Sequence, residues 1–184
     1  MNSVRVIVFL VAFSILFGMI SATQISFAYD TKNPIKPSAK TMKISSAFEN
    51  NGKIPKKYTC DGANVSPPLK ISNVPKNAKS LALILDDPDA PSGTFTHWVV
   101  WGMSPKKTQL GEGEKKGFME GITGLGKPGY VGLCPPSGVH RYFFKLYALD
   151  FQVDISTKSN KQELMTAMQN HIIQTAILTG KYSR

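Results

Sequence analysis

Several motifs of common enzyme classes are absent from this chain of 184 residues. It has no HExxH zinc pair and no strand-to-helix loop for phosphate or dinucleotide binding. Ser92 and Ser137 each precede a glycine, but neither stands in the GxSxG turn of a serine hydrolase. We therefore expect a protein without enzymatic activity, cofactor or bound metal.

Long apolar runs are missing after residue 28. Before it, Arg5 precedes a mostly apolar stretch from Val6 to Ile20, and Ser26-Phe27-Ala28 resembles a signal-peptidase site. At 15 residues, the apolar stretch is shorter than the roughly 20 that a membrane helix needs. We expect a signal peptide at 1–28, cleaved after Ala28, a flexible linker at 29–42, and a secreted or extracytoplasmic domain at 43–184. The alternative is an uncleaved N-terminal membrane anchor.

Cysteine is scarce, since Cys60 and Cys134 are the only two in the chain. Exported proteins mature in oxidising compartments, where pairs of cysteines form disulfides. We therefore expect a disulfide between Cys60 and Cys134. The alternative is two separate buried thiols.

Acidic residues are also few, 12 against 22 Lys and Arg, so the formal net charge is +10. Such a charge is compatible with nucleic acid or an anionic surface as a partner. Here the lysines are dispersed through loops and do not alternate with aromatic residues, so we expect no nucleic-acid partner. A solvated cationic surface is the favoured interpretation, with weak contact to an anionic membrane surface as the alternative.

The apolar pattern predicts a mostly β domain of the α+β class. Strand-length runs occur at 42–48, 69–74, 80–85, 97–103 and 142–149, and the continuous run at 80–85 indicates a strand buried on both faces. Residues 104–129, rich in Gly and Lys, are expected to form a long surface loop.

One helix is predicted near the C-terminus. Asn160 and Glu163 form a capping box, so the helix should run from Lys161 to about Thr179 and end at Gly180. Its sheet-facing stripe would comprise Leu164, Met168, Ile172 and Thr175. His171 lies beside this stripe and is expected to be structural.

Polar side chains collect near strand ends in two segments. Residues 85–101 hold Asp87 and Asp89 in an Asp-Pro-Asp-Ala-Pro corner, followed by His97 before an apolar run. Residues 130–142 have the same design, with glycines and prolines before His140. Turn formation alone can explain such a corner. Two histidines at two strand mouths nevertheless predict one shared pocket, because strands fix the positions of their ends.

Short motifs in a fixed order give the chain a family resemblance. They are YTCDG at 58–62, SPPL at 66–69, DPDAP at 87–91, HW at 97–98, CPPSG at 134–138 and GVHRY at 138–142. Together they resemble the phosphatidylethanolamine-binding protein family, also called Raf kinase inhibitor proteins, in its prokaryotic branch. The resemblance implies a large central antiparallel sheet flanked by a smaller sheet and a C-terminal helix. It also implies an anion pocket at Asp87, His97, Gly132 and His140, with Pro135 and Tyr142 close by.

The expected ligand is a phosphate-bearing head group or a similar small anion. The two imidazoles and the backbone near Gly132 would surround it, while Asp87 orients one imidazole. Asp89 would serve the loop or meet an ammonium group on the ligand. Arg141 should point away from His140 and pair with an acidic loop residue, because neighbouring strand residues face opposite ways. The alternatives are an extracellular inhibitor that binds a protease or kinase, and a metal-dependent hydrolase.

Overall fold

The computed structural model describes residues 40–184, so the predicted signal peptide and most of the predicted linker lie outside the described residues. The strands are β1 (Lys43–Ser46), β2 (Gly52–Lys53), β3 (Leu69–Ser72), β4 (Ser80–Asp87), β5 (Phe95–Met103), β6 (Gln109–Leu110), β7 (Met119–Glu120), β8 (Val139–Leu149) and β9 (Ile172–Ser183). The helices are η1 (Lys56–Tyr58), a single 3₁₀ turn, and α1 (Lys161–Met168).

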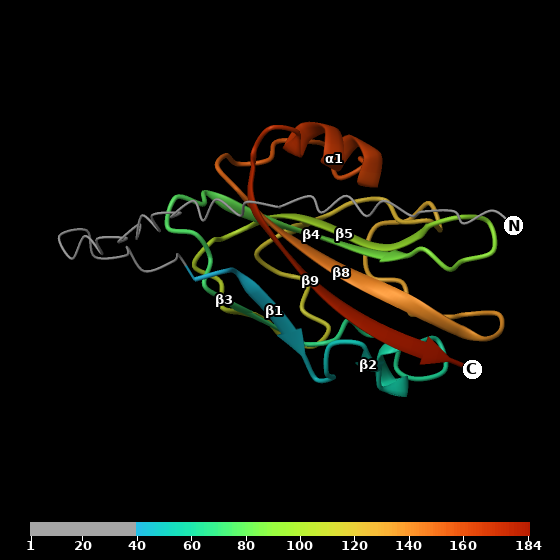
Figure 1. Ribbon diagram of the computed structural model, residues 1–184. Coiled ribbons are helices and arrows are strands. Elements are labelled where there is room, and N and C mark those ends of the chain that lie inside the picture. Colours follow the sequence, from blue (N-terminus) through green and yellow to red (C-terminus); the bar gives the residue numbers. More distant parts are fainter. Residues whose placement is uncertain (1–39) are drawn as a thin grey trace, which may run out of the picture. The chain divides into compact units, whose positions relative to one another are not determined.

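These elements form three layers (Figure 1). A sheet in the order β2-β9-β8-β4-β5-β7 lies in the middle, a sheet in the order β1-β3-β6 covers one face, and α1 covers the other. Apart from the parallel pair β2 and β9, neighbouring strands run antiparallel. The predicted mostly β fold, with a large sheet, a smaller sheet and a C-terminal helix, is confirmed.

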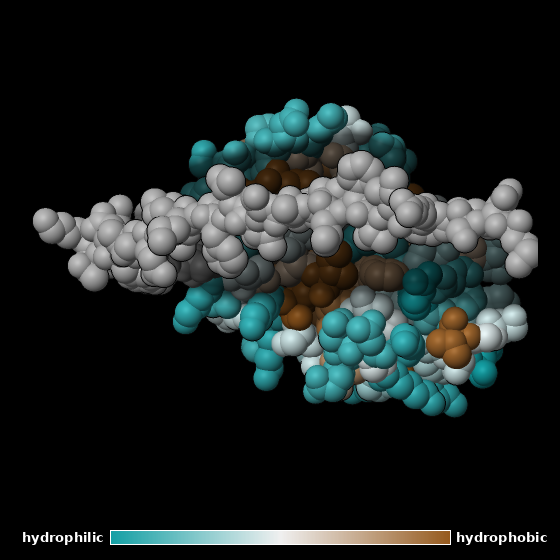
Figure 2. Space-filling view, viewed as in Figure 1, coloured by the Kyte–Doolittle hydropathy of each residue, from teal (hydrophilic) through white to brown (hydrophobic). Residues whose placement is uncertain are grey.

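Alternating side chains on the central strands build two cores. In β8, Tyr142, Phe144 and Leu146 face the small sheet, whereas Tyr147 and Leu149 face α1. Every residue of β4 is buried, which confirms the prediction of a strand covered on both faces. Figure 2 shows hydrophilic atoms on the outside of α1 and hydrophobic atoms beneath it, as expected for a helix packed on a sheet.

The predicted helix at 161–179 is wrong in its second half. Its start is confirmed, because Asn160 Oδ1 accepts hydrogen bonds from Gln162 N at 2.8 Å and Glu163 N at 3.2 Å. The helix ends at Met168, Asn170 takes a positive φ of 67°, and β9 begins at Ile172. Ile172 and Thr175 therefore belong to a strand that pairs with β8. Repeated β-branched residues after residue 171 favour this outcome.

Gly180 lies within β9 and does not end a helix. A Cβ atom at this position would clash with Ile54 and would lie 2.7 Å from Cε2 of Phe48. Glycine is needed here because two core side chains pack directly against the strand backbone.

The predicted surface loop at 104–129 contains two short strands. In it, β6 pairs with β3 of the small sheet and β7 pairs with β5 of the large sheet. The loop therefore connects the two sheets. None of the helices in residues 40–184 is long and apolar enough to cross a membrane.

Candidate functional site

Four of the predicted site residues line one cavity of about 470 Å³, namely Asp87, His97, Gly132 and His140. They come from the end of β4, from β5, from the loop before β8 and from the start of β8. The rest of the wall consists of Cys60, Asn64, Ala90, Pro91, Phe95, Leu125, Val131, Cys134 and Pro136. The structure thus brings the two predicted segments together around a single cavity.

His97 reaches the cavity through a β-bulge in β5. Leu85 pairs with Trp98 and Asp86 pairs with Thr96, so His97 is an extra residue without a partner in β4. Bulges turn a side chain out of the regular alternation and occur often beside binding sites. Phe95 and His97, two residues apart, line the same cavity, and the bulge lets Trp98, next to His97, pack in the core beneath the small sheet.

The hydrogen bonds of His97 fix its tautomer. Its Nδ1 lies 2.9 Å from the carbonyl oxygen of Val131, and a carbonyl only accepts, so Nδ1 carries the proton. Burial lowers the pKa of His97 below 6.5, although the Val131 carbonyl and the charge of Asp87 oppose this effect. The ring is therefore neutral at pH 7, and Nε2 is its remaining hydrogen-bond acceptor.

His140 is held by a buried carboxylate. Its Nδ1 lies 2.8 Å from Oδ2 of Asp87, and both side chains are less than one tenth exposed. The other oxygen of Asp87 accepts a hydrogen bond from the backbone N–H of Asp89 at 2.9 Å. Nδ1 of His140 thus donates to Asp87, and Nε2 is again the ring nitrogen available to a ligand.

Tyr142 lies beneath the two imidazoles and is fully buried. Its ring centroid lies 5.4 Å from that of His97 and 6.5 Å from that of His140. Among the described residues its hydroxyl has no hydrogen-bond partner. Burial raises the pKa of the Tyr142 hydroxyl, and the nearby Asp87 carboxylate raises it further. The hydroxyl and that carboxylate do not form a hydrogen bond. The phenol therefore stays protonated at neutral pH.

The disulfide between Cys60 and Cys134, which the sequence predicted, forms part of the cavity wall. It joins the loop carrying Asn64 to the loop carrying Gly132. A side chain at Gly132 would clash with Asn64 and would lie 2.9 Å from the backbone nitrogen of Cys60. Glycine therefore lets the two loops close against each other.

Sequence reasoning missed several wall residues, namely Asn64, Phe95, Leu125 and Pro136. Asn64 was the easiest of these to find, because it follows the YTCDG motif closely and the disulfide carries that motif to the pocket. Leu125 was hidden in a glycine-rich loop without periodicity. Leu125 is 60% exposed, and several other large apolar residues of the domain are exposed to a similar degree, so its exposure gave no signal either.

Pro135, Tyr142 and Asp89 were predicted in or near the site but do not line the cavity, whereas His171 was expected to be structural. Pro135 is buried next to the cavity, and Pro136 lines the wall in its place. His171 follows α1 and contacts Oδ1 of Asp150 at 2.8 Å, so it lies outside the helix and outside the cavity wall.

Asp89 is instead bound by Arg141, as the sequence predicted for that arginine. Nε and one terminal nitrogen of the guanidinium donate to the two carboxylate oxygens at 2.8 and 2.7 Å. These hydrogen bonds lower the pKa of Asp89 to about 2. Its carboxylate is thus engaged in holding the β4–β5 loop against β8.

The cavity wall contains no lysine or arginine among the described residues. Residues 40–184 also hold no group of three His, Cys, Asp or Glu side chains placed to bind a metal ion. Besides Asp87, the polar groups in the cavity wall are the two imidazoles, the side-chain amide of Asn64 and the backbone at Gly132. These polar groups can bind a small ligand that gives a proton to a histidine ring or takes one from it.

Comparisons with known proteins agree on one family. Residues 44–183 match the family model described as phosphatidylethanolamine-binding protein. A UPF0098 protein from Methanothermobacter thermautotrophicus is 49% identical over 144 residues, which cover 75% of this chain and 95% of that protein.

Two solved structures are similar throughout the described domain. One is a homologue of phosphatidylethanolamine-binding protein from Chlamydia trachomatis, with a TM-score of 0.77, 43% identity, and coverage of 78% of this chain and 98% of that chain. The other is YbcL from E. coli, with a TM-score of 0.73, 27% identity, and coverage of 79% and 99%.

Proposed function

Because this chain belongs to the phosphatidylethanolamine-binding protein family, we propose that it binds a small phosphate-bearing or similar anion between His97 and His140. We further propose that it acts as an exported binding protein and not as an enzyme. One observation carries the ligand site: both rings use Nδ1 for contacts within the protein, which leaves both Nε2 atoms for a ligand.

A hydrogen bond between an imidazole Nε2 and an anion requires a proton. A neutral imidazole offers only an acceptor at Nε2, and no lysine or arginine lines the cavity wall among residues 40–184. For an imidazole Nε2 to contact the anion, the ligand brings a proton, as a phosphate monoanion does, or the ring takes one up. Asp87 lies where its charge would balance an imidazolium at His140. Binding is thus expected to tighten as the pH falls from about 8 to about 6, across the ordinary histidine range.

Isothermal titration calorimetry tests this proposal. Inorganic phosphate is titrated into the protein at pH 7 in two buffers of different ionisation enthalpy, which reports the protons taken up on binding. We expect uptake of up to about one proton, because phosphate supplies part of the proton itself. Binding without a change in protonation, and with no dependence on pH, would contradict the proposal.

Sulfate is a matched control, since it has the same shape as phosphate but carries no proton at neutral pH. We expect phosphate to bind more tightly than sulfate at pH 7.5, because only phosphate can donate a proton to an imidazole Nε2. The variant His140→Ala should weaken binding of both anions. Unchanged affinity in that variant would remove the cavity as the binding site.

A further inference from the structure

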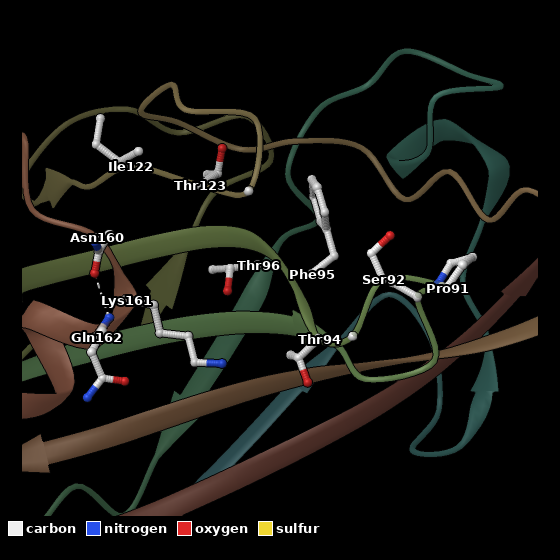
Figure 3. Close-up of a pocket in the computed structure, with 13 residues that line it drawn as sticks. Pro91, Ser92, Thr94, Phe95, Thr96, Ile122, Thr123, Asn160, Lys161 and Gln162 are labelled. Carbon is white, nitrogen blue, oxygen red and sulfur yellow. Dashed lines mark hydrogen bonds between the residues drawn. The ribbon is translucent and has the colours of Figure 1, made fainter.

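A second cavity, of about 570 Å³, adjoins the first (Figure 3). The β4–β5 loop, the loop after β7 and the start of α1 surround it. Ala90, Pro91 and Phe95 contribute to the walls of both cavities. Phe95 also packs against His97, with ring centroids 4.7 Å apart. The two cavities are therefore neighbours that share one aromatic wall.

The wall of the second cavity combines apolar and polar side chains, and none of its described residues is acidic. Four hydroxyls lie in its wall, those of Ser92, Thr94, Thr96 and Thr123. The wall also carries the side-chain amides of Asn160 and Gln162 and the ammonium group of Lys161. Thr96 and Lys161 lie side by side in Figure 3, and both contact the same carboxylate, that of Asp86. Hydroxyls and amides arranged around an aromatic ring suit a ligand that carries several hydroxyl groups.

Beside this cavity, positively charged side chains outnumber negatively charged ones. Asp86 is 1% exposed, and its Oδ2 accepts hydrogen bonds from both Lys145 and Lys161 at 2.9 Å, while Oδ1 accepts one from Thr96 at 3.0 Å. Two ammonium groups thus share one carboxylate. Both lysine side chains remain about one third exposed, at 30% and 32%, so the surplus charge faces solvent. An anion entering the cavity would meet Lys161 at its wall.

We propose that this second cavity binds a small hydroxylated anion, that is, a carboxylate or phosphate group on a polyol skeleton. The anionic group would contact Lys161, and the hydroxyls would contact Thr94 and Gln162 beside the ring of Phe95. This site is separate from the pocket of His97 and His140 and does not depend on it.

NMR titration of the full chain tests the second site. The probes are glycerol 3-phosphate and glycerate, with glycerol and inorganic phosphate as controls. We expect at least one of the two hydroxylated anions to cause saturable shifts of the Thr94, Lys161 and Gln162 amides, and glycerol to cause none. Comparing the two anions distinguishes a phosphate site from a carboxylate site. These shifts should persist in His140→Ala, which alters only the first cavity.

Three lysine variants that each lose one positive charge test the role of Lys161, and Lys158→Gln is the control among them. Lys161→Gln should weaken binding about tenfold, because it removes the ion pair with the ligand, while Asp86 keeps Lys145 and Thr96. Lys145→Gln should weaken binding about threefold through loss of the surplus charge. Lys158 is exposed and does not line the cavity, so Lys158→Gln should leave binding unchanged.

Three results would overturn the second site. Shifts confined to His97 and His140 would place the ligand in the first cavity. Equal binding of glycerol would exclude an anion site, and equal effects of Lys158→Gln and Lys161→Gln would show a general surface charge effect. A failure of phosphate to bind at His97 and His140 would count against the first site only, because the Thr94, Lys161 and Gln162 signals are independent of it.

Discussion

His97 and His140 face one cavity but have different partners at Nδ1. The partner of His97 is the neutral carbonyl of Val131, whereas the partner of His140 is the carboxylate of Asp87. A carboxylate stabilises a positive ring and a carbonyl does so much less. The two rings are therefore expected to take different roles, because Asp87 can balance a positive charge on His140 whereas burial lowers the pKa of His97.

Asp87→Asn separates the charge of this residue from its shape. An asparagine can still accept a hydrogen bond from Nδ1 of His140, but it no longer balances an imidazolium. We expect phosphate affinity at pH 7 to fall about tenfold by calorimetry, the loss of one charge interaction. Asp154→Asn, at an exposed position that does not line the cavity, is the charge-matched control and should bind like the original chain. If both variants bind equally well, Asp87 does not support the ligand through charge.

Stability should depend on pH through His97. Burial lowers the pKa of His97 below 6.5 in the folded state, so below that pH the unfolded chain binds a proton that the folded chain does not. The free energy of unfolding therefore falls as the pH drops below 6.5, until the folded-state pKa is reached. Urea unfolding at pH 7.5 and 5.5 should show a smaller loss in His97→Gln. An equal loss in both chains would assign the effect to other groups.

Gly180 gives a direct test of the strand that replaced the predicted helix. In β9 a methyl group at this position meets Ile54 and Phe48, so Gly180→Ala should lower the free energy of unfolding by about 1–3 kcal/mol. At Gly111, an added Cβ would lie 3.4 Å from its nearest neighbour and φ is not positive, so Gly111→Ala is the control and should change little. A neutral or stabilising Gly180→Ala would contradict the packing described here.

Local signals in the sequence were sufficient for most elements. The continuous run at 80–85 and the alternation at 142–149 predicted β4 and the larger part of β8, and the capping box predicted the start of α1. The end of α1 could not be found this way, because Leu164, Met168, Ile172 and Thr175 fit a helix as well. Residues Ile172–Ser183 form a strand because they pair with β8, which lies earlier in the chain. A local pattern does not contain this information.

The site was predictable only in part for a similar reason. Asp87, His97, Gly132 and His140 stand in recognisable motifs, so their meeting in one cavity followed from the family resemblance. The bulge at His97 depends on the register between β4 and β5, which sequence alone does not specify. The second cavity was missed because its lining residues come from three loop or helix termini that have no shared motif.

Across the whole domain, the disulfide links two loops that are 74 residues apart in sequence and that both line the first cavity. Closing a loop of this length stabilises a protein by about 4 kcal/mol in the chain-entropy model. We expect the double variant Cys60→Ser and Cys134→Ser to lose stability toward this amount in urea unfolding, and to bind phosphate more weakly. Unchanged stability and affinity would mean that the contacts around Gly132 hold the loops together without the bridge.

The shared anion pocket of His97 and His140 is tested most directly by an NMR titration of the three histidine rings. Inorganic phosphate is added to the full chain at pH 7. His171 is the internal control, since its ring contacts Asp150 and does not line the first cavity. We expect His97 and His140 to shift together and to saturate at one phosphate concentration while His171 stays in place. Equal shifts of all three rings, or no shift of His97 and His140, would contradict a shared anion pocket.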